Sequence, residues 1–363
     1  MATSIFDLET PAPVVDLTTM ERNLDRMASY ARAHGIALRP HTKTHKTARI
    51  AGLQLDRGAA GVTCATVREA EVMSQVADDI LIAYPVLGTP KLRRLMALPD
   101  RVRLTVALDS AEAANGLSAA ARERGRTVGV YVEADLGMRR VGVASAAEAV
   151  TLARHVASLP SLALAGVAFY PGHVREHTSA QDASLARLAS DVSALTDALA
   201  RAGLPPRVVS GGSTPTAWRT HELPGVSEMR PGTYVYNDRV TAAVGAAHWS
   251  DCALTVLATV VSTAVPGQAV IDAGTKALGR EPMRGADGEG FGALLDHPEV
   301  VVRAMSEEHG ILHLGDSGWR PRVGDVVRVV PNHVCIVVHL NDVVWAARGE
   351  RVEEPWPVEA RGR

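Results

Sequence analysis

The sequence predicts an α/β protein in two parts. A (β/α)8 TIM barrel spans residues 11–245, and a mostly antiparallel β domain spans residues 246–363. Two observations carry this prediction. In the first part, short apolar runs alternate eight times with stretches that carry apolar residues at helical spacing. After Ala243 the alternation stops, and β-branched runs separated by Gly, Pro and Asp turns follow, as is typical of a β domain.

The eight apolar runs are the predicted barrel strands. They cover residues 35–41, 61–65, 80–85, 102–109, 128–135, 162–170, 207–212 and 227–236. Helical patterns fill several gaps between them, for example at 66–77, 110–125 and 184–203, and the last two end at a glycine.

The predicted strands of the β domain lie in five further runs. These are residues 252–264, 268–278, 300–314, 325–340 and 342–358. No low-complexity linker marks the boundary near residue 245, so we expect the two parts to pack tightly.

Composition excludes several classes of protein. A net charge of −2 and only 4% aromatic residues disfavour a nucleic-acid surface. Three cysteines, far apart in the sequence, do not form a disulfide framework. The N-terminus does not resemble a signal peptide, and no apolar run reaches membrane-spanning length. We therefore expect a cytoplasmic protein with no membrane or nucleic-acid partner.

Lysine is scarce in this chain, and the positions of two of its lysines indicate a reactive amine. The 38 basic residues include only four lysines, and Lys43 and Lys46 follow the first predicted strand together. A solvated basic turn is the ordinary explanation of such a pair. However, a desolvated lysine amine can attack a carbonyl group, whereas arginine stays protonated. In a barrel, functional residues gather at the carboxyl ends of strands, where Lys43 lies.

The same rule selects further polar residues at this rim. They are Tyr84, Asp109, Asp135, Arg140, Tyr170, His173, Arg230 and Tyr234. After the seventh strand, Gly212 allows a close backbone approach, and Ser213 and Thr214 offer amides and hydroxyls that suit a phosphate. A phosphate site beside a reactive lysine indicates pyridoxal 5'-phosphate.

Six motifs together resemble the D-threonine aldolase and D-serine dehydratase family across essentially the whole chain. They are "RPHTKTHK", "DLGMRRVG", "FYPGH", "SGGSTPT", "RPGTYVYND" and "PNHVC". The resemblance implies fold type III of the pyridoxal-phosphate enzymes, an alanine-racemase-like barrel with a β domain. It implies that Lys43 carries the cofactor, that Arg140 contacts its phenolic oxygen, and that Tyr170 and His173 lie beside its ring. The implied phosphate contacts are Gly212, Ser213, Thr214 and Tyr234.

His333 and Cys335 form the remaining candidate site. On a predicted strand their side chains would point the same way, but two ligands are too few for a structural zinc site. From the sequence alone, His333 and Cys335 are most simply interpreted as ordinary core residues. The resemblance instead implies a divalent metal beside the cofactor, zinc first, with manganese or magnesium as alternatives, and a catalytic role for both residues with Lys43.

The implied function is a lyase acting on a β-hydroxy D-amino acid. Elimination would give a 2-oxo acid and ammonia, as in D-serine dehydratase. Aldolases of the family tend to have Asp where this chain has Cys335, which favours the dehydratase. The alternatives are retro-aldol cleavage to glycine and an aldehyde, an amino-acid racemase, and a non-catalytic carrier of pyridoxal phosphate. Family members are commonly dimers, so we expect a homodimer.

Overall fold

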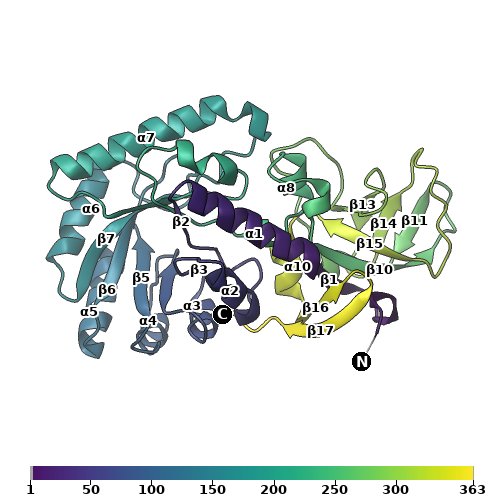
Figure 1. Cartoon of the computed structure of the whole chain (residues 1–363), viewed down its shortest axis with the longest axis horizontal. Helices are drawn as coiled ribbons and strands as arrows, with labels where there is room; N and C mark the ends of the chain where they lie inside the picture. Colours follow the sequence, from purple (N-terminus) through teal and green to yellow (C-terminus); the bar gives the residue numbers. More distant parts are fainter. Residues whose placement is uncertain (1–2, 363) are drawn as a thin grey trace.

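The first part of the chain folds into the predicted barrel. The computed structural model describes residues 3–362, and Figure 1 shows a barrel and a separate β domain side by side. Every strand pair of the barrel sheet is parallel, and the order is β2-β9-β8-β7-β6-β5-β4-β3. The strands are β2 (Ala37–Leu38), β3 (Val62–Cys64), β4 (Asp79–Ile82), β5 (Arg103–Leu108), β6 (Val128–Glu133), β7 (Leu162–Ala168), β8 (Val208–Gly211) and β9 (Glu228–Met229).

Helices surround the barrel sheet. They are α1 (Leu17–Ala33), α2 (Ala48–Asp56), α3 (Val67–Met73), α4 (Thr89–Met96), α5 (Ala111–Arg124), α6 (Ala146–Ser158) and α7 (Asp182–Arg201). Capping residues start several of them: Ser110 accepts a hydrogen bond from the amide of Ala113, and Ser145 accepts one from Glu148. The apolar faces of α3–α7 pack against the strands in one continuous core.

The two ends of the barrel sheet meet at the loop that carries Lys43. His41 and Thr63 form a parallel bridge between the segments after β2 and within β3. The amide of Thr42 donates to the Thr63 carbonyl at 2.8 Å, and the amide of Thr63 donates to the Pro40 carbonyl at 2.8 Å. Lys43 therefore follows directly on the bonds that close the barrel.

The β domain is a nine-stranded sheet that also contains the first strand of the chain. Its order is β11-β14-β13-β12-β15-β10-β1-β16-β17. The strands are β1 (Ala12–Asp16), β10 (Leu254–Ser262), β11 (Gln268–Ile271), β12 (Gly292–Leu294), β13 (Val301–Met305), β14 (Gly310–His313), β15 (Val326–Pro331), β16 (Val343–Arg348) and β17 (Arg351–Pro357).

The placement of β1 corrects the predicted start of the barrel at residue 11. Val14 and Val15 are buried, and successive strand residues face opposite sides, so β1 needs cover on both faces. Val15 packs in the core with Met20 of α1, and Val14 packs with Ile5 in a separate cluster on the other face. Within the sheet, β1 pairs along its two edges with β10, to which it is antiparallel, and with β16, to which it is parallel. Helix α1 then leads the chain from the β domain to the barrel (Figure 1).

Two predicted strand runs of the β domain contain helices, and one of them carries the candidate metal ligands. The run at 268–278 becomes β11 and the short helix α9 (Thr275–Leu278). The run at 325–340 becomes β15 and α10 (Val334–Leu340), so His333 and Cys335 do not lie on a strand as predicted. The chain leaves the sheet after Pro331, and the carboxylate of Asp238 accepts the amide of Val334 at 3.3 Å. His333 is the N-cap of α10.

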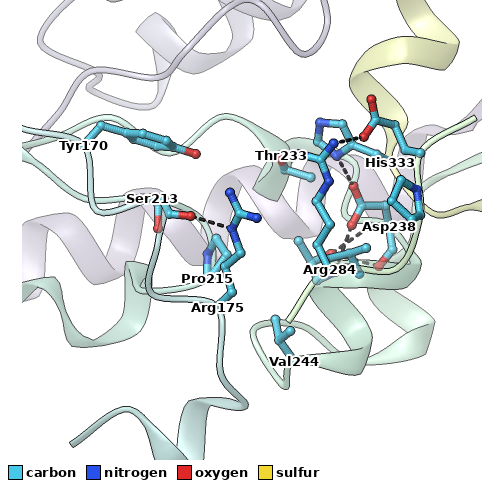
Figure 2. A pocket seen from close by; sticks show the side chains of 14 residues that line it. Tyr170, Arg175, Ser213, Pro215, Thr233, Asp238, Val244, Arg284 and His333 are labelled. Carbon is cyan, nitrogen blue, oxygen red and sulfur yellow. Dashed lines mark hydrogen bonds and ion pairs between the residues drawn. The ribbon is translucent and has the colours of Figure 1, made fainter. Parts of the chain in front are cut away.

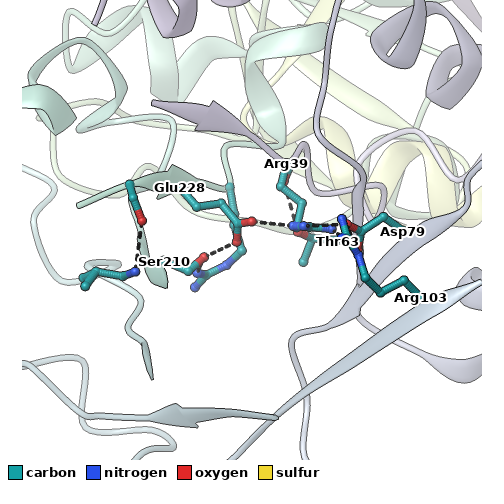
Figure 3. A network of polar contacts seen from close by, with 9 residues as sticks. Arg39, Thr63, Asp79, Arg103, Ser210 and Glu228 are labelled. Atoms are coloured by element: carbon teal, nitrogen blue, oxygen red, sulfur yellow. Dashed lines mark hydrogen bonds and ion pairs between the residues drawn. The ribbon is translucent and has the colours of Figure 1, made fainter. Parts of the chain in front are cut away.

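A buried polar network links strands inside the barrel (Figure 3). The guanidinium of Arg39 donates to Asp79 of β4 at 2.8 Å and to Glu228 of β9 at 2.6 Å. Glu228 also accepts the hydroxyl of Ser210 at 2.6 Å, and Ser210 in turn accepts a hydrogen bond from Arg230. The network therefore holds Arg230, which follows β9, at the end of the barrel where Lys43 lies.

Across residues 3–362, none of the helices combines the length and the apolar character that crossing a bilayer requires.

Candidate active site

One cavity collects most of the predicted cofactor-binding residues. We call it the lysine cavity, and its lining includes Lys43, Arg140, Tyr170, Gly212, Ser213 and Thr214. These residues come from loops that follow β2, β6, β7 and β8. The parallel barrel explains why positions up to 171 residues apart in the sequence meet here, because every strand delivers its following loop to the same rim.

The two neighbouring lysines have different environments. The Nζ of Lys46 lies 2.5 Å from the carboxylate of Glu69, and both side chains are buried. Lys43 instead lines the cavity, with its Nζ 5.7 Å from the centre of the Tyr170 ring. Of the other two lysines, Lys276 pairs with Glu308 at 2.6 Å on the surface. Lys43 is thus the lysine whose amine faces the cavity.

The aromatic ring of Tyr170 lies close to two cations that line this cavity. The guanidinium carbon of Arg140 lies 5.0 Å from the ring centre. The loop that carries Arg140 is shaped by Asp135, whose carboxylate accepts the amides of Gly137 at 2.9 Å and Arg139 at 3.0 Å. Lys43 and Arg140 therefore lie beside the same aromatic ring in the lysine cavity.

The turn after β8 provides hydroxyl groups with different partners. Gly212 has φ of +87°, a conformation that favours glycine. The amide and the hydroxyl of Ser213 both contact the hydroxyl of Thr216, at 3.2 and 3.0 Å. The hydroxyl of Thr214 is buried and has no hydrogen-bond partner within residues 3–362. Buried hydroxyls are usually hydrogen-bonded, so Thr214 is poised to bond a molecule held in the cavity.

These residues fit pyridoxal phosphate. Among residues 3–362 no carboxylate forms an ion pair with the Lys43 amine, which suits the aldehyde carbonyl of the cofactor. The glycine turn with the Thr214 hydroxyl suits its phosphate. Arg140 and Arg230 add positive charge to the same cavity. The residues present therefore match both ends of the cofactor.

Two predicted cofactor contacts lie outside the lining of the lysine cavity. His173 is exposed, and its ring packs close to Gly137. Tyr234 is buried on the 3-10 turn Thr233–Val235, and its hydroxyl accepts a hydrogen bond from Gln54 at 3.0 Å. In this structure, the Tyr234 hydroxyl is therefore already bonded within the protein.

A second cavity adjoins the first. Both are lined by Tyr170, Ser213, Pro215 and Thr233, and the second also reaches His333 (Figure 2). We call it the histidine cavity. The β domain thus brings a predicted metal ligand to the wall of the site that the barrel builds.

The carboxylate of Asp238 orients His333. Its Oδ2 lies 3.0 Å from Nδ1 of His333, and its Oδ1 accepts the amide of Thr241 at 2.9 Å, which caps α8 (Arg239–Ala243). A carboxylate at Nδ1 fixes the proton there and leaves Nε2 available to a metal. The negative charge of a Cys335 thiolate, together with the Asp238 carboxylate, raises the pKa of His333 well above its ordinary value.

Cys335 is suited to act as a thiolate. Burial raises the pKa of its thiol, but His333 and Lys43 outweigh burial and lower the pKa to about 7. Its sulfur lies 3.3 Å from the hydroxyl of Thr44. An imidazole nitrogen and a thiolate are donors that zinc accepts. No group of three or more His, Cys, Asp or Glu is arranged as a metal site within residues 3–362.

Sequence reasoning did not single out Asp238, Glu133 or Arg175. Glu133 lines the lysine cavity with one carboxylate oxygen unpartnered, and burial raises its pKa. Arg175 lines the histidine cavity. Only Asp238 carries a sequence signal, since Asp before a short apolar segment is a common helix N-cap.

Comparisons with known proteins agree with this architecture. Residues 15–240 match the alanine racemase N-terminal domain, and residues 253–346 match the serine dehydratase domain. A 3-hydroxy-D-aspartate aldolase from Paracoccus denitrificans is 33% identical, over 98% of this chain and 93% of its own. The crystal structure of D-threonine aldolase from Filomicrobium marinum has a TM-score of 0.91 and 33% identity, covering 99% of this chain and 97% of that one.

A further solved structure that matches this chain is described by its metal content. The solved cysteine-to-alanine variant of a D-threo-3-hydroxyaspartate dehydratase, described as a metal-free form, matches with a TM-score of 0.88 and 33% identity over the whole of both chains. The fold, the matched domains and these relatives lead to one assignment. The chain belongs to the D-threonine aldolase and D-serine dehydratase family of pyridoxal-phosphate-dependent lyases, with an alanine-racemase-like barrel.

Proposed function

We propose that this protein uses pyridoxal phosphate and a divalent metal to eliminate water from β-hydroxy D-amino acids. The product is a 2-oxo acid with ammonia. The observation that carries the proposal is the adjacency of the two cavities, because Lys43 lines one, His333 lines the other, and Tyr170 lines both. A substrate held at Tyr170 can present its Cα to Lys43 and its β-oxygen toward His333.

The cofactor would be held by Lys43, the turn at Gly212–Thr214 and Arg140. When bound, pyridoxal phosphate supplies an electron sink for negative charge at Cα. The amine of Lys43 is then placed to remove the Cα proton. The ring of Tyr170 lies beside both Lys43 and Arg140, and it would limit where the ring of the cofactor can lie.

The metal would be held by Nε2 of His333 and the sulfur of Cys335. A cation at this position supplies Lewis-acid polarisation of a hydroxyl group. Loss of the β-hydroxyl as water leaves an enamine, and its hydrolysis consumes one water and releases the 2-oxo acid and ammonia. We propose zinc as the cation, because a thiolate and an imidazole are softer donors than carboxylates.

Retro-aldol cleavage is the second candidate, favoured by the relatives that are named aldolases. It would use the same residues but release glycine and an aldehyde. Product analysis separates the two, with D-serine, D-threonine and 3-hydroxy-D-aspartate as substrates. We expect a 2-oxo acid, and glycine instead would establish the aldolase. Exchange of the Cα proton with no change at Cβ would indicate a racemase.

A further inference from the structure

The histidine cavity receives two arginines that neither the cofactor nor the metal requires. Arg175 follows β7 and Arg284 precedes β12, and both line this cavity. Their segments are in close contact, since a Cβ atom at Gly285 would lie 2.0 Å from the carbonyl oxygen of Arg175. Gly285 also has φ of +78°, so glycine is favoured at this contact for two reasons. The two arginines therefore share one wall.

The two guanidinium groups differ in their partners. Arg284 forms an ion pair with Glu281, which also lines the cavity. Nε of Arg175 donates to the carbonyl of Gly172 at 2.6 Å, and within residues 3–362 no carboxylate lies within ion-pair distance of its guanidinium. Figure 2 shows this guanidinium extending into the space between Tyr170 and His333. The hydrogen bond to the Gly172 carbonyl orients the guanidinium of Arg175, and the two terminal nitrogens of that guanidinium remain available to a ligand.

We propose that Arg175 binds a second carboxylate of the substrate, so that the preferred substrates are β-hydroxy D-amino acids with an acidic side chain. This rests on the proposed function, in which Cα lies at Lys43 and the β-oxygen lies toward His333. The group beyond Cβ then lies in the histidine cavity, where Arg175 is located. A guanidinium binds a carboxylate through two parallel hydrogen bonds. A hydrogen or methyl group in that place would leave the terminal nitrogens of Arg175 without a carboxylate partner.

The test uses the cofactor-loaded, metal-loaded enzyme and two ligands that carry no β-hydroxyl group. D-aspartate and D-alanine are titrated separately, and binding is followed by the change in the visible spectrum. The wild type should bind D-aspartate about 100-fold more tightly than D-alanine, and Arg175→Gln should remove most of that difference. Arg175→Lys should retain part of it, because a lysine keeps the charge but lacks the fork. Arg348→Gln is the matched control and should change the ratio by less than about threefold, because Arg348 pairs with Glu21 on the surface and lines neither cavity.

Turnover gives the second readout. The ratio of kcat/KM for 3-hydroxy-D-aspartate to that for D-serine should fall about 100-fold in Arg175→Gln. An equal loss on both substrates would place Arg175 at the α-carboxylate and overturn the proposal, as would equal wild-type affinity for D-aspartate and D-alanine. A wild type that binds D-aspartate through Arg175 but converts neither hydroxylated substrate would contradict the lyase function alone.

Discussion

Nδ1 of His333 lies 3.0 Å from the carboxylate of Asp238, and this contact ties the β domain to the end of the barrel. Asp238 follows the last barrel strand, whereas His333 begins α10 in the β domain. The same carboxylate accepts the amides of Thr241 and Val334. One buried side chain therefore sets both the tautomer of His333 and the position of the helix that carries Cys335.

Asp238→Asn should weaken metal binding about 10- to 100-fold, because an amide cannot fix the proton on Nδ1 as a carboxylate does. The fold should be largely retained, since Asn caps helices about as well as Asp. Titration of metal-free protein with zinc against a competing chelator measures the affinity, and thermal unfolding checks the fold. An unchanged zinc affinity would show that Asp238 has no part in the metal site.

Borohydride reduction should attach the cofactor irreversibly to Lys43. Lys43 faces the lysine cavity, whereas the amine of Lys46 is engaged by Glu69. Peptide mapping by mass spectrometry identifies the modified residue. Lys43→Ala should abolish the modification, and Lys276→Ala, on an exposed surface pair, is the control that should not. Cofactor found on Lys46 would contradict the assignment.

Thr214→Val should leave the stability of the cofactor-free protein nearly unchanged but weaken cofactor binding. In the part of the chain that the structure describes, the hydroxyl has no hydrogen-bond partner, so its loss removes no hydrogen bond there. A hydrogen bond to a charged phosphate contributes about 1.5–3 kcal/mol, which corresponds to roughly 10- to 150-fold in affinity. Urea unfolding and a spectroscopic cofactor titration measure the two quantities. Wild-type cofactor affinity would place the phosphate elsewhere.

Acid should destabilise the cofactor-free protein partly through His45. Burial lowers the pKa of His45 to about 3, whereas an unfolded histidine titrates near about 6.5. Between these values the unfolded state binds a proton that the folded state does not, so stability falls as pH falls. Around pH 5 the contribution approaches about 1.4 kcal/mol per pH unit. His45→Gln should show a shallower dependence in urea unfolding between pH 7 and 4; an identical slope would contradict this account.

The sequence could predict the barrel and most of the lysine cavity because parallel strands deliver their following loops to one rim. That geometry, with the βα rhythm, placed Lys43, Arg140, Tyr170 and the Gly212 turn together. It could not place β1, because a short apolar run does not show which sheet will bury it.

The sequence could not predict the helical conformation of α10 or the position of Arg175 in the histidine cavity, for two other reasons. Four of the eight residues in the segment "HVCIVVHL" are β-branched, which favours a strand, whereas the Asp238 carboxylate from another part of the chain accepts a hydrogen bond from the amide of Val334 at the start of the helix. Arg175 reaches the histidine cavity through packing against Gly285, 110 residues away. The homodimer and the cytoplasmic location stay predictions.

The most direct test of the account is release of 2-oxo acid from a β-hydroxy D-amino acid before and after exhaustive chelation, with the visible spectrum recorded on the same samples. We predict that chelation abolishes 2-oxo acid release, leaves the absorbance of the bound cofactor intact, and is reversed by zinc. Cys335→Ala should behave as the chelated enzyme does, because one remaining ligand cannot hold the cation in place. Full turnover by a preparation in which elemental analysis finds no metal would contradict the account and return His333 and Cys335 to structural roles.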